Sequence, residues 1–188
     1  MAQNSSIEWT DHTFNPWWGC SKVSPACLHC YAETWAKRVG QKIWGVQSPR
    51  RLFGTAHWDE PVRWDAEAEA SGIRRRVFCA SMADVFESRS ELTDEREKLW
   101  TLVETTPSLD WLLLTKRPQN TFRFAPWSDE WPNNVWVGTT VENQHWANQA
   151  PSAACCSSRT SFSFVRTTFG SAGFASMDLG SRQELISN

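Results

Sequence analysis

Apolar residues gather in three short runs along the chain, and each run ends in polar side chains. The runs lie at residues 76–82, 111–115 and 135–139. Apolar and polar positions do not alternate within them, as they would in a strand with one exposed face. The pattern therefore predicts three strands that are buried on both faces, which is typical of a parallel sheet.

Segments with helical periodicity lie before and between these runs. Residues 31–39 carry apolar side chains at helical spacing, and Gly40 follows where such a helix would end. Thr93 precedes two acidic residues and a second periodic stretch, so we expect it to cap a helix that ends before Pro107. Residues 41–72 mix Trp, Pro and charged residues without a clear period, and we expect a loop with short helical pieces there.

Strands that alternate with helices indicate an α/β fold, in which helices cover both faces of a parallel sheet. Functional groups in such folds collect at the carboxyl ends of the strands. Asp84, Lys116 and Glu142 follow the three predicted strands in this way. Each could be an ordinary loop residue, but their repetition at successive strand ends favours a functional interpretation.

Composition limits the partners and the compartment. The chain has 188 residues and a formal net charge of −2, so no overall attraction for nucleic acid or membranes is indicated. The N-terminus has neither the basic nor the apolar segment of a secretion signal, and no apolar run approaches the length of a membrane span. We therefore expect a cytoplasmic protein, in which clustered cysteines bind metal more often than they form disulfides.

Three cysteines within eleven residues form the most specific chemical motif of the sequence, which we call the cysteine loop. Cys20, Cys27 and Cys30 follow the spacing C-x6-C-x2-C, so one loop can turn all three thiols toward a single metal centre. Three thiolates would hold an iron–sulfur cluster with one iron open for a substrate or cofactor. A zinc site with His29 as fourth ligand and three unrelated buried cysteines stay open as alternatives. Cys79 lies in a predicted strand and is expected to be a buried thiol.

Four motifs, in this order, resemble an uncharacterised family encoded by phages and prophages, the phage gp thirty-seven/gp sixty-eight family, which is grouped with radical S-adenosylmethionine enzymes. They are residues 15–20 (NPWWGC), the cysteine loop with residues 31–33 (YAE), residues 114–118 (LTKRP) and residues 135–144 (VWVGTTVENQ). The resemblance covers residues 5–149. The usual cysteine spacing of that superfamily is C-x3-C-x2-C, and the longer first gap here departs from it.

The resemblance implies an incomplete (β/α) barrel in residues 1–149 and a radical S-adenosylmethionine type of enzyme whose substrate is unknown. The three thiols of the cysteine loop would ligate a [4Fe-4S] cluster, and S-adenosylmethionine would bind its fourth iron. Asp84, Lys116 and Glu142 become candidates for cofactor or substrate contacts. The resemblance also implies that the protein itself positions the cluster and the cofactor relative to each other and excludes water.

Two other functions stay open. The chain could be a zinc-stabilised binding module that acts with a phage or host partner. It could also be an enzyme that modifies or repairs nucleic acid, since its thirteen tryptophans could stack on bases. A Trp-rich core explains these tryptophans at least as well.

The composition changes abruptly near Gln149. All tryptophans lie between Trp9 and Trp146, and the residues that follow are rich in Ser, Thr, Ala and Gly. Read one base later, degenerate codons for residues 161–175 allow Arg-Phe-Leu-Ser-Cys-Glu-Pro-Leu-Leu-Gly-Pro-Leu-Asp-Leu, which resembles the next strand of the family. We therefore expect residues 150–188 to be a frameshifted tail without an independent domain, disordered or weakly packed. The barrel would then stop after about four strands, and the chain would be a truncated, inactive copy.

Overall fold

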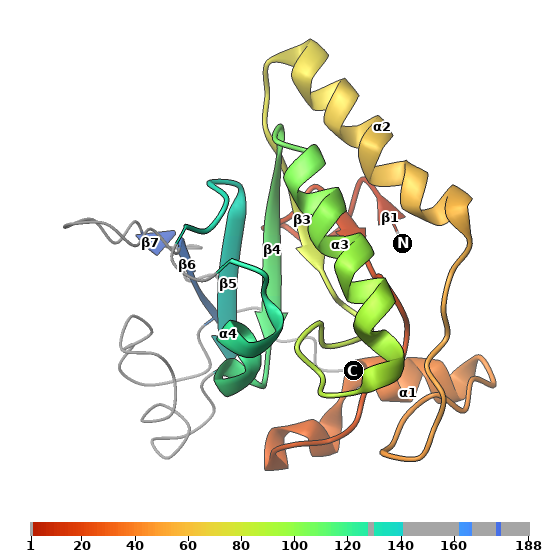
Figure 1. The fold of residues 1–188 in the computed structure, drawn as a ribbon. Coiled ribbons are helices and arrows are strands. Elements are labelled where there is room, and N and C mark those ends of the chain that lie inside the picture. Colours follow the sequence, from red (N-terminus) through yellow and green to blue (C-terminus); the bar gives the residue numbers. More distant parts are fainter. Residues whose placement is uncertain (1, 128–129, 141–161, 167–175, 178–188) are drawn as a thin grey trace.

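The strands form one sheet in the computed structural model, which describes residues 2–127, 130–140, 162–166 and 176–177 (Figure 1). They lie side by side in chain order: β1 (Ala2–Gln3), β2 (His12–Phe14), β3 (Arg75–Cys79), β4 (Leu109–Thr115), β5 (Val135–Thr140), β6 (Phe162–Arg166) and β7 (Ser176–Met177). The four strands from β2 to β5 are parallel, whereas β1, β6 and β7 pair antiparallel. Within the described residues the sheet is open and does not close into a barrel.

The three strands expected from the apolar runs are confirmed as β3, β4 and β5. They are parallel neighbours, with Val77 opposite Trp111 and Trp111 opposite Val135. The predicted α/β fold class with an incomplete parallel sheet is therefore confirmed. The predicted change of reading frame concerns residues that lie mostly outside the described part of the chain, and it stays a prediction.

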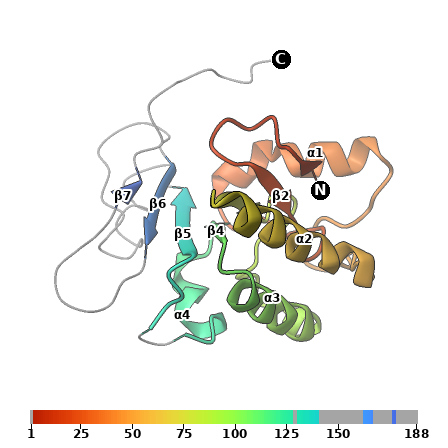
Figure 2. The same cartoon turned by 90° about the horizontal axis from the view of Figure 1, so that it is seen from above.

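Four α-helices and three short 3-10 helices accompany the sheet in the described part of the chain: α1 (Tyr31–Arg38), α2 (Thr55–Ser71), α3 (Thr93–Thr105), α4 (Thr121–Phe124), η1 (Pro25–His29), η2 (Ser90–Leu92) and η3 (Pro118–Asn120). Figure 2 shows α2 and α3 close together beside the strands, and in Figure 1 α1 lies below them. No helix in this part of the chain is long and apolar enough to cross a membrane.

The main hydrophobic core lies between α2, α3 and one face of the sheet. Trp64 of α2 and Leu99 of α3 pack in one cluster with Val77, Trp111 and Leu113 of the strands. Many of the tryptophans thus belong to the core. Their large buried surface makes a core of this kind a strong contributor to stability.

The opposite face of the sheet is covered differently. There, Leu112 and Trp136 are buried against Trp9 and Leu114, and none of these four residues lies in a helix. Both faces of β4 are apolar, as the unalternating sequence predicts. The expectation of helices on both faces is not met within the described residues, because a cluster of side chains covers the second face.

The expectation of a loop at residues 41–72 was wrong, because α2 occupies its second half as a helix of 17 residues. Its buried side chains are Pro61, Trp64 and Ala68, which recur at the spacing of one helical face. The helical period was not recognised because the buried positions hold a proline, an aromatic residue and a small residue. Gly72 ends the helix in the left-handed conformation, with a φ of 65°.

The other helix boundaries lie close to those expected. The helix expected at residues 31–39 is α1, which ends one residue earlier. Thr93 is the first residue of α3 instead of its cap, because the 3-10 helix η2 ends at Leu92 and leads directly into it. This helix ends at Thr105, before Pro107 as expected.

The carboxyl ends of the parallel strands meet at one edge of the sheet. In Figure 1 the arrowheads of β3 and β4 point toward α1, which lies across this end of the molecule. A small hydrophobic cluster attaches α1 there, formed by Ala32, Ala36, Ile43 and Met82. The segment between β2 and α1, which includes the cysteine loop, is therefore held at the edge where parallel folds place their chemistry.

Candidate functional site

The cysteine loop begins at a glycine that no other residue could replace without strain. Gly19 has a φ of 113°, and a Cβ atom on it would lie 2.4 Å from the carbonyl oxygen of Ile43. Its N–H donates a hydrogen bond of 2.9 Å to the carbonyl of Met82, beyond the end of β3. This close approach fixes the start of the loop, and hence Cys20, beside the strand ends.

The other two thiols lie around the short helix η1. Cys27 is within it, and its N–H donates to the carbonyl oxygen of Ser24 at 3.0 Å. Cys30 is the residue between η1 and α1. Cys27 is buried, whereas Cys20 and Cys30 are partly buried, and all three are free thiols.

The surroundings of the thiols differ in their effect on ionisation. Burial, together with the nearby negative charge of Asp84, raises the pKa of Cys20 to about 12, although Arg117 acts in the opposite direction. Burial also raises the pKa of Cys27, but hydrogen bonds from its own loop and the positive charge of Lys116 outweigh it, so this pKa lies below its ordinary value. Burial alone raises the pKa of Cys79, which is fully buried in β3 as predicted.

The donor set fits a thiolate-held metal centre in number and chemistry, since three free thiols lie on one loop. The three sulfur atoms do not surround a common point: among the residues that the structure describes, no three His, Cys, Asp or Glu side chains are grouped so that they could hold a metal ion. His29, the alternative zinc ligand, is exposed at the last position of η1. Binding of a metal would require the loop to draw its sulfur atoms together.

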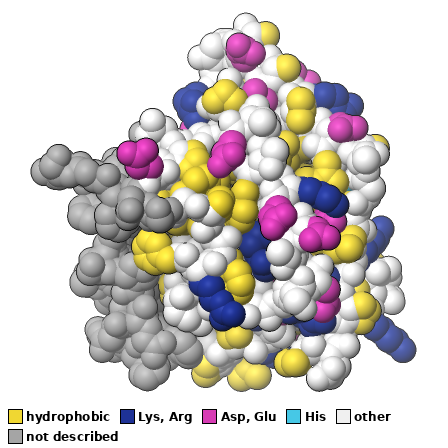
Figure 3. Space-filling view, in the orientation of Figure 1, with side chains coloured by type: hydrophobic (Ala, Val, Ile, Leu, Met, Phe, Trp, Pro, Cys, Tyr) yellow, Lys and Arg dark blue, Asp and Glu magenta, His cyan; other side chains and the backbone are white. Residues whose placement is uncertain are grey.

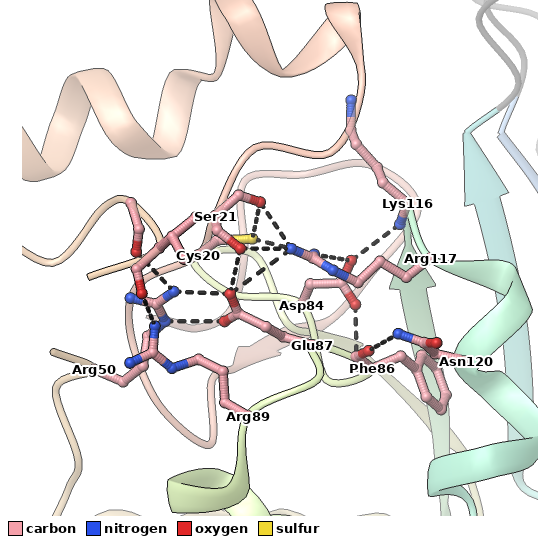
Figure 4. A network of polar contacts seen from close by, with 12 residues as sticks. Cys20, Ser21, Arg50, Asp84, Phe86, Glu87, Arg89, Lys116, Arg117 and Asn120 are labelled. Carbon is pink, nitrogen blue, oxygen red and sulfur yellow. Dashed lines mark hydrogen bonds and ion pairs between the residues drawn. The ribbon is translucent and has the colours of Figure 1, made fainter. Parts of the chain in front are cut away.

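A buried network of charges ties the cysteine loop to the strand ends (Figure 4). Its centre is Arg117, which follows β4. The Arg117 guanidinium donates to the Cys20 sulfur at 3.5 Å, to the Ser21 carbonyl oxygen at 2.8 Å and to the Ser21 hydroxyl at 2.9 Å. It also pairs with Asp84 at 3.1 Å and with Glu87 at 3.7 Å. One side chain therefore joins the loop after β2 to the segment after β3.

Glu87 carries the second half of this network. It accepts two hydrogen bonds from Arg50, of 2.7 and 2.9 Å, and one of 2.6 Å from the Ser21 hydroxyl. Burial raises the pKa of Glu87, but the hydrogen bonds from Arg50 and Ser21 outweigh burial and leave it below its ordinary value. The network is thus charged, and both partners of the Arg50–Glu87 pair are almost wholly buried.

The structure brings Asp84, one of the predicted strand-end residues, into this network and leaves the Lys116 side chain at its margin. Asp84 accepts hydrogen bonds from the Thr115 hydroxyl at 2.8 Å and from the Lys116 backbone N–H at 3.1 Å, besides its ion pair. Its oxygens therefore bond within the fold and orient other groups. The Lys116 side chain points away from the network in Figure 4. Glu142 lies outside the described residues.

Sequence reasoning missed Glu87, Arg50 and Ser21, and it noted Arg117 as a polar residue at a strand end without choosing it as a site residue. A local signal existed for Glu87, which is an acid directly after two apolar residues at positions 85 and 86. For Arg117 the signal was its place beside Lys116 at a strand end. The partners of these side chains are far away in sequence, so no local pattern could pair them.

A hollow lies at the amino end of the sheet, opposite the cysteine loop. It encloses about 420 Å³ beside His12, which stacks on Trp64 with ring centroids 4.5 Å apart. Burial lowers the pKa of His12. The Thr10 hydroxyl in its lining lies 2.8 Å from the carbonyl oxygen of His12 and 2.9 Å from that of Arg76, and the two oxygens share its one proton. This hollow is therefore separate from the cysteine loop, and part of its polar lining already bonds within the fold.

Charges on the visible surface do not single out a partner. On the face shown in Figure 3, acidic and basic side chains are interspersed, and hydrophobic side chains lie between them. This agrees with the small net charge of the chain. The buried network, rather than a surface field, is the distinctive electrostatic feature.

Comparison with known proteins finds one family. The model of a family of proteins of unknown function, DUF5131, matches residues 4–164, which include the cysteine loop, the network and the parallel strands. No curated protein and no solved structure matches the chain. Since the match covers most of its length, the chain belongs to the DUF5131 family.

Proposed function

We propose that the cysteine loop binds an iron–sulfur cluster, and that the protein is an enzyme of the radical S-adenosylmethionine type from the phage gp thirty-seven/gp sixty-eight family. One observation carries this proposal: three free thiols lie on one loop at the carboxyl end of four parallel strands, where Arg117 holds the loop to β4. The cytoplasm, where thiols stay reduced, is the compartment that the proposal requires.

Two positive charges favour a centre made of thiolates, and they act against the burial and the Asp84 charge that raise the pKa of Cys20. Arg117 lies 3.5 Å from the Cys20 sulfur, and the charge of Lys116 favours the ionised form of Cys27. A bound cluster would supply one-electron chemistry toward S-adenosylmethionine. The contribution of the chain itself is to place the loop, to compensate its negative charge and to exclude water on the buried side.

Metal analysis tests the proposal. Protein purified without oxygen should contain iron and sulfide and absorb visible light, and Cys27→Ala should lose most of both. Cys79→Ala is the matched control, because this thiol is fully buried in the main hydrophobic core and is not part of the cysteine loop, and it should keep its iron. Full iron content in a variant that lacks all three loop cysteines would refute the proposal. Zinc without visible absorption would favour a zinc-stabilised binding module that acts with a phage or host partner.

A second candidate function is an enzyme that acts on nucleic acid. Two exposed aromatic side chains favour it: Tyr31 is 63% exposed and Trp35 is 40% exposed, and both lie on α1 directly after the cysteine loop. The Tyr31 hydroxyl donates to the Ser81 carbonyl oxygen at 2.6 Å, which holds the ring in place. Lys37 and Arg38 are exposed in the last turn of the same helix. Rings beside cations are the usual platform for single-stranded nucleic acid.

Binding of a fluorescent single-stranded oligonucleotide tests this second candidate. Trp35→Ala should weaken binding about 5- to 150-fold, the range expected for one stacked base. Val46→Ala is the control, because Val46 is exposed but lies outside α1. Affinity that is equal in both variants, or independent of salt, would exclude this surface.

The proposal also holds that this chain is a shortened, inactive copy. The change of composition near Gln149 supports this part, whereas the family match runs past that point to residue 164. Sequencing of the gene tests this part. It fails if no one-base shift near codon 150 opens a longer frame that contains the Cys-Glu-Pro strand.

A further inference from the structure

We infer that Arg117 is a positioning residue of the cysteine loop, which fixes the Cys20 end of the loop against β4 and places a positive charge beside the Cys20 sulfur. The positioning part stands on the geometry alone. The charge part rests on the proposed function, because it concerns a cluster bound to that sulfur.

The contacts of Arg117 divide into two sets. Toward the loop, its Nη2 atom donates to both oxygens of Ser21, at 2.8 and 2.9 Å, and its Nη1 atom donates to the Cys20 sulfur at 3.5 Å. Toward the core, Nη1 also donates to Asp84 at 3.1 Å. The guanidinium therefore lies between a fixed carboxylate and the loop, and its side chain is only 6% exposed.

The direction of the side chain is set by groups that do not belong to the loop. Asp84 is itself held by the Thr115 hydroxyl at 2.8 Å and by the Phe86 N–H at 3.0 Å. Glu87, which lies 3.7 Å from Arg117, is held by Arg50. Because Asp84 is buried and its other bonds come from uncharged groups, the guanidinium cannot turn away without removing the positive charge beside this carboxylate.

Lysine could not replace this function. A guanidinium presents several N–H groups in a rigid plane, so it can donate to a carboxylate on one side and a carbonyl on the other. A single ammonium at position 117 could pair with Asp84, but it could not bridge to Ser21 at the same time. Arg117→Lys thus keeps the charge and removes the anchor.

Hydrogen exchange tests the positioning part on the whole chain, with or without metal. In Arg117→Lys, amides of residues 17–30 should exchange about tenfold faster or more, because a charge-assisted anchor of the loop is lost. Arg74→Lys is the matched control. Arg74 also forks between a carboxylate, Asp110, and a backbone oxygen, that of Pro107, but at the amino end of the sheet. It should leave the exchange of residues 17–30 unchanged.

Ser21→Ala provides a second test in case Arg117→Lys does not fold. It removes the hydroxyl that Arg117 and Glu87 share and leaves every charge in place. A smaller increase in the exchange of residues 17–30 is expected. Unchanged exchange of these residues in both Arg117→Lys and Ser21→Ala would overturn the positioning role.

The reduction potential of the bound cluster tests the charge part. Arg117→Gln should shift the one-electron equilibrium about tenfold toward the oxidised form, about 59 mV more negative, because a positive charge near the sulfur is removed. Arg117→Lys should shift it less. A purely structural role would speed exchange in both variants and leave the potential unchanged, which would overturn the charge part.

The two failures are distinguishable. A wild-type chain that holds no iron overturns the proposed function and with it the charge part, while hydrogen exchange still decides the positioning role. A chain that holds iron, but whose loop exchanges equally in wild type, Arg117→Lys and Ser21→Ala, supports the proposed function and overturns the positioning role.

Discussion

Replacing Glu87 with glutamine would remove the charge that compensates two buried guanidinium groups while keeping the size of the side chain. Glu87 and Arg50 are 3% and 1% exposed, so water cannot replace the lost partner. In Glu87→Gln, the acceptors left to Arg50 are the one amide oxygen of glutamine and backbone carbonyl oxygens, such as that of Ser48 at 2.7 Å, and none of them carries a charge. Removal of one partner of a buried pair costs about 3–5 kcal/mol.

This loss is large compared with the total stability of a domain, which is about 5–15 kcal/mol. In a chain of this length each kcal/mol lowers the melting temperature by about 2–4 °C, so Glu87→Gln should melt about 6–20 °C below wild type. Urea unfolding should give the same loss in free energy, with an unchanged dependence on urea concentration. Arg74→Gln, which breaks an ion pair whose arginine is 49% exposed, should cost less than about 1 kcal/mol.

The double variant Arg50→Met with Glu87→Leu separates the charge from the space that it fills. If the cost arises from an uncompensated buried charge, the double variant should recover most of the stability that Glu87→Gln loses. A loss below about 1 kcal/mol in Glu87→Gln would contradict the reasoning, since it would mean that water reaches the pair.

Other predictions concern acidity, the glycine, the core and the metal. The pKa of Glu87 in the folded protein lies below its ordinary value of 4.5. The ionised Glu87 therefore stabilises the fold fully above pH 4.5, and this contribution is lost as the pH falls through the folded pKa. Below pH 4.5, the stability of wild type should depend more steeply on pH than that of Glu87→Gln. Gly19→Ala should destabilise the fold by about 1–3 kcal/mol or more, measured in urea, because its Cβ would meet the Ile43 carbonyl. Leu113→Ala should cost about 2–5 kcal/mol in the same assay, since this side chain is fully buried. Iron bound by the cysteine loop should be released on acidification, because protons compete for the thiolates. Loss of visible absorption measures this release.

The central part of the fold could be predicted from the sequence because its signal is local. Each buried strand is a continuous apolar run, and the side chains of a strand need no knowledge of their partners to be apolar. The helix α2 was missed because its buried face is made of Pro61, Trp64 and Ala68, which hydrophobicity alone does not mark as a period. Pro61, moreover, is strongly disfavoured within a helix.

The site could be predicted only in part, for a different reason. The spacing of the cysteines is a local pattern, so the loop and its place at the strand ends could be read directly. Asp84 was found by its position after a strand, yet its oxygens bond to Thr115 and Arg117 and so serve the scaffold. Arg117 escaped because its partner Ser21 lies 96 residues away, and only the folded chain brings them together.

The separation between Cys20 and Arg117 also has a consequence for the order of events on the ribosome. Cys20 and Arg117 are 97 residues apart in the sequence, so the cysteine loop is synthesised long before the arginine that holds it. At a translation rate of about 5–20 residues per second, the nascent loop waits roughly 5–20 seconds for Arg117. If the loop binds a metal as proposed, metal that arrives during that interval meets a segment that Arg117 does not yet hold, whereas metal that arrives later meets a loop already bonded to β4.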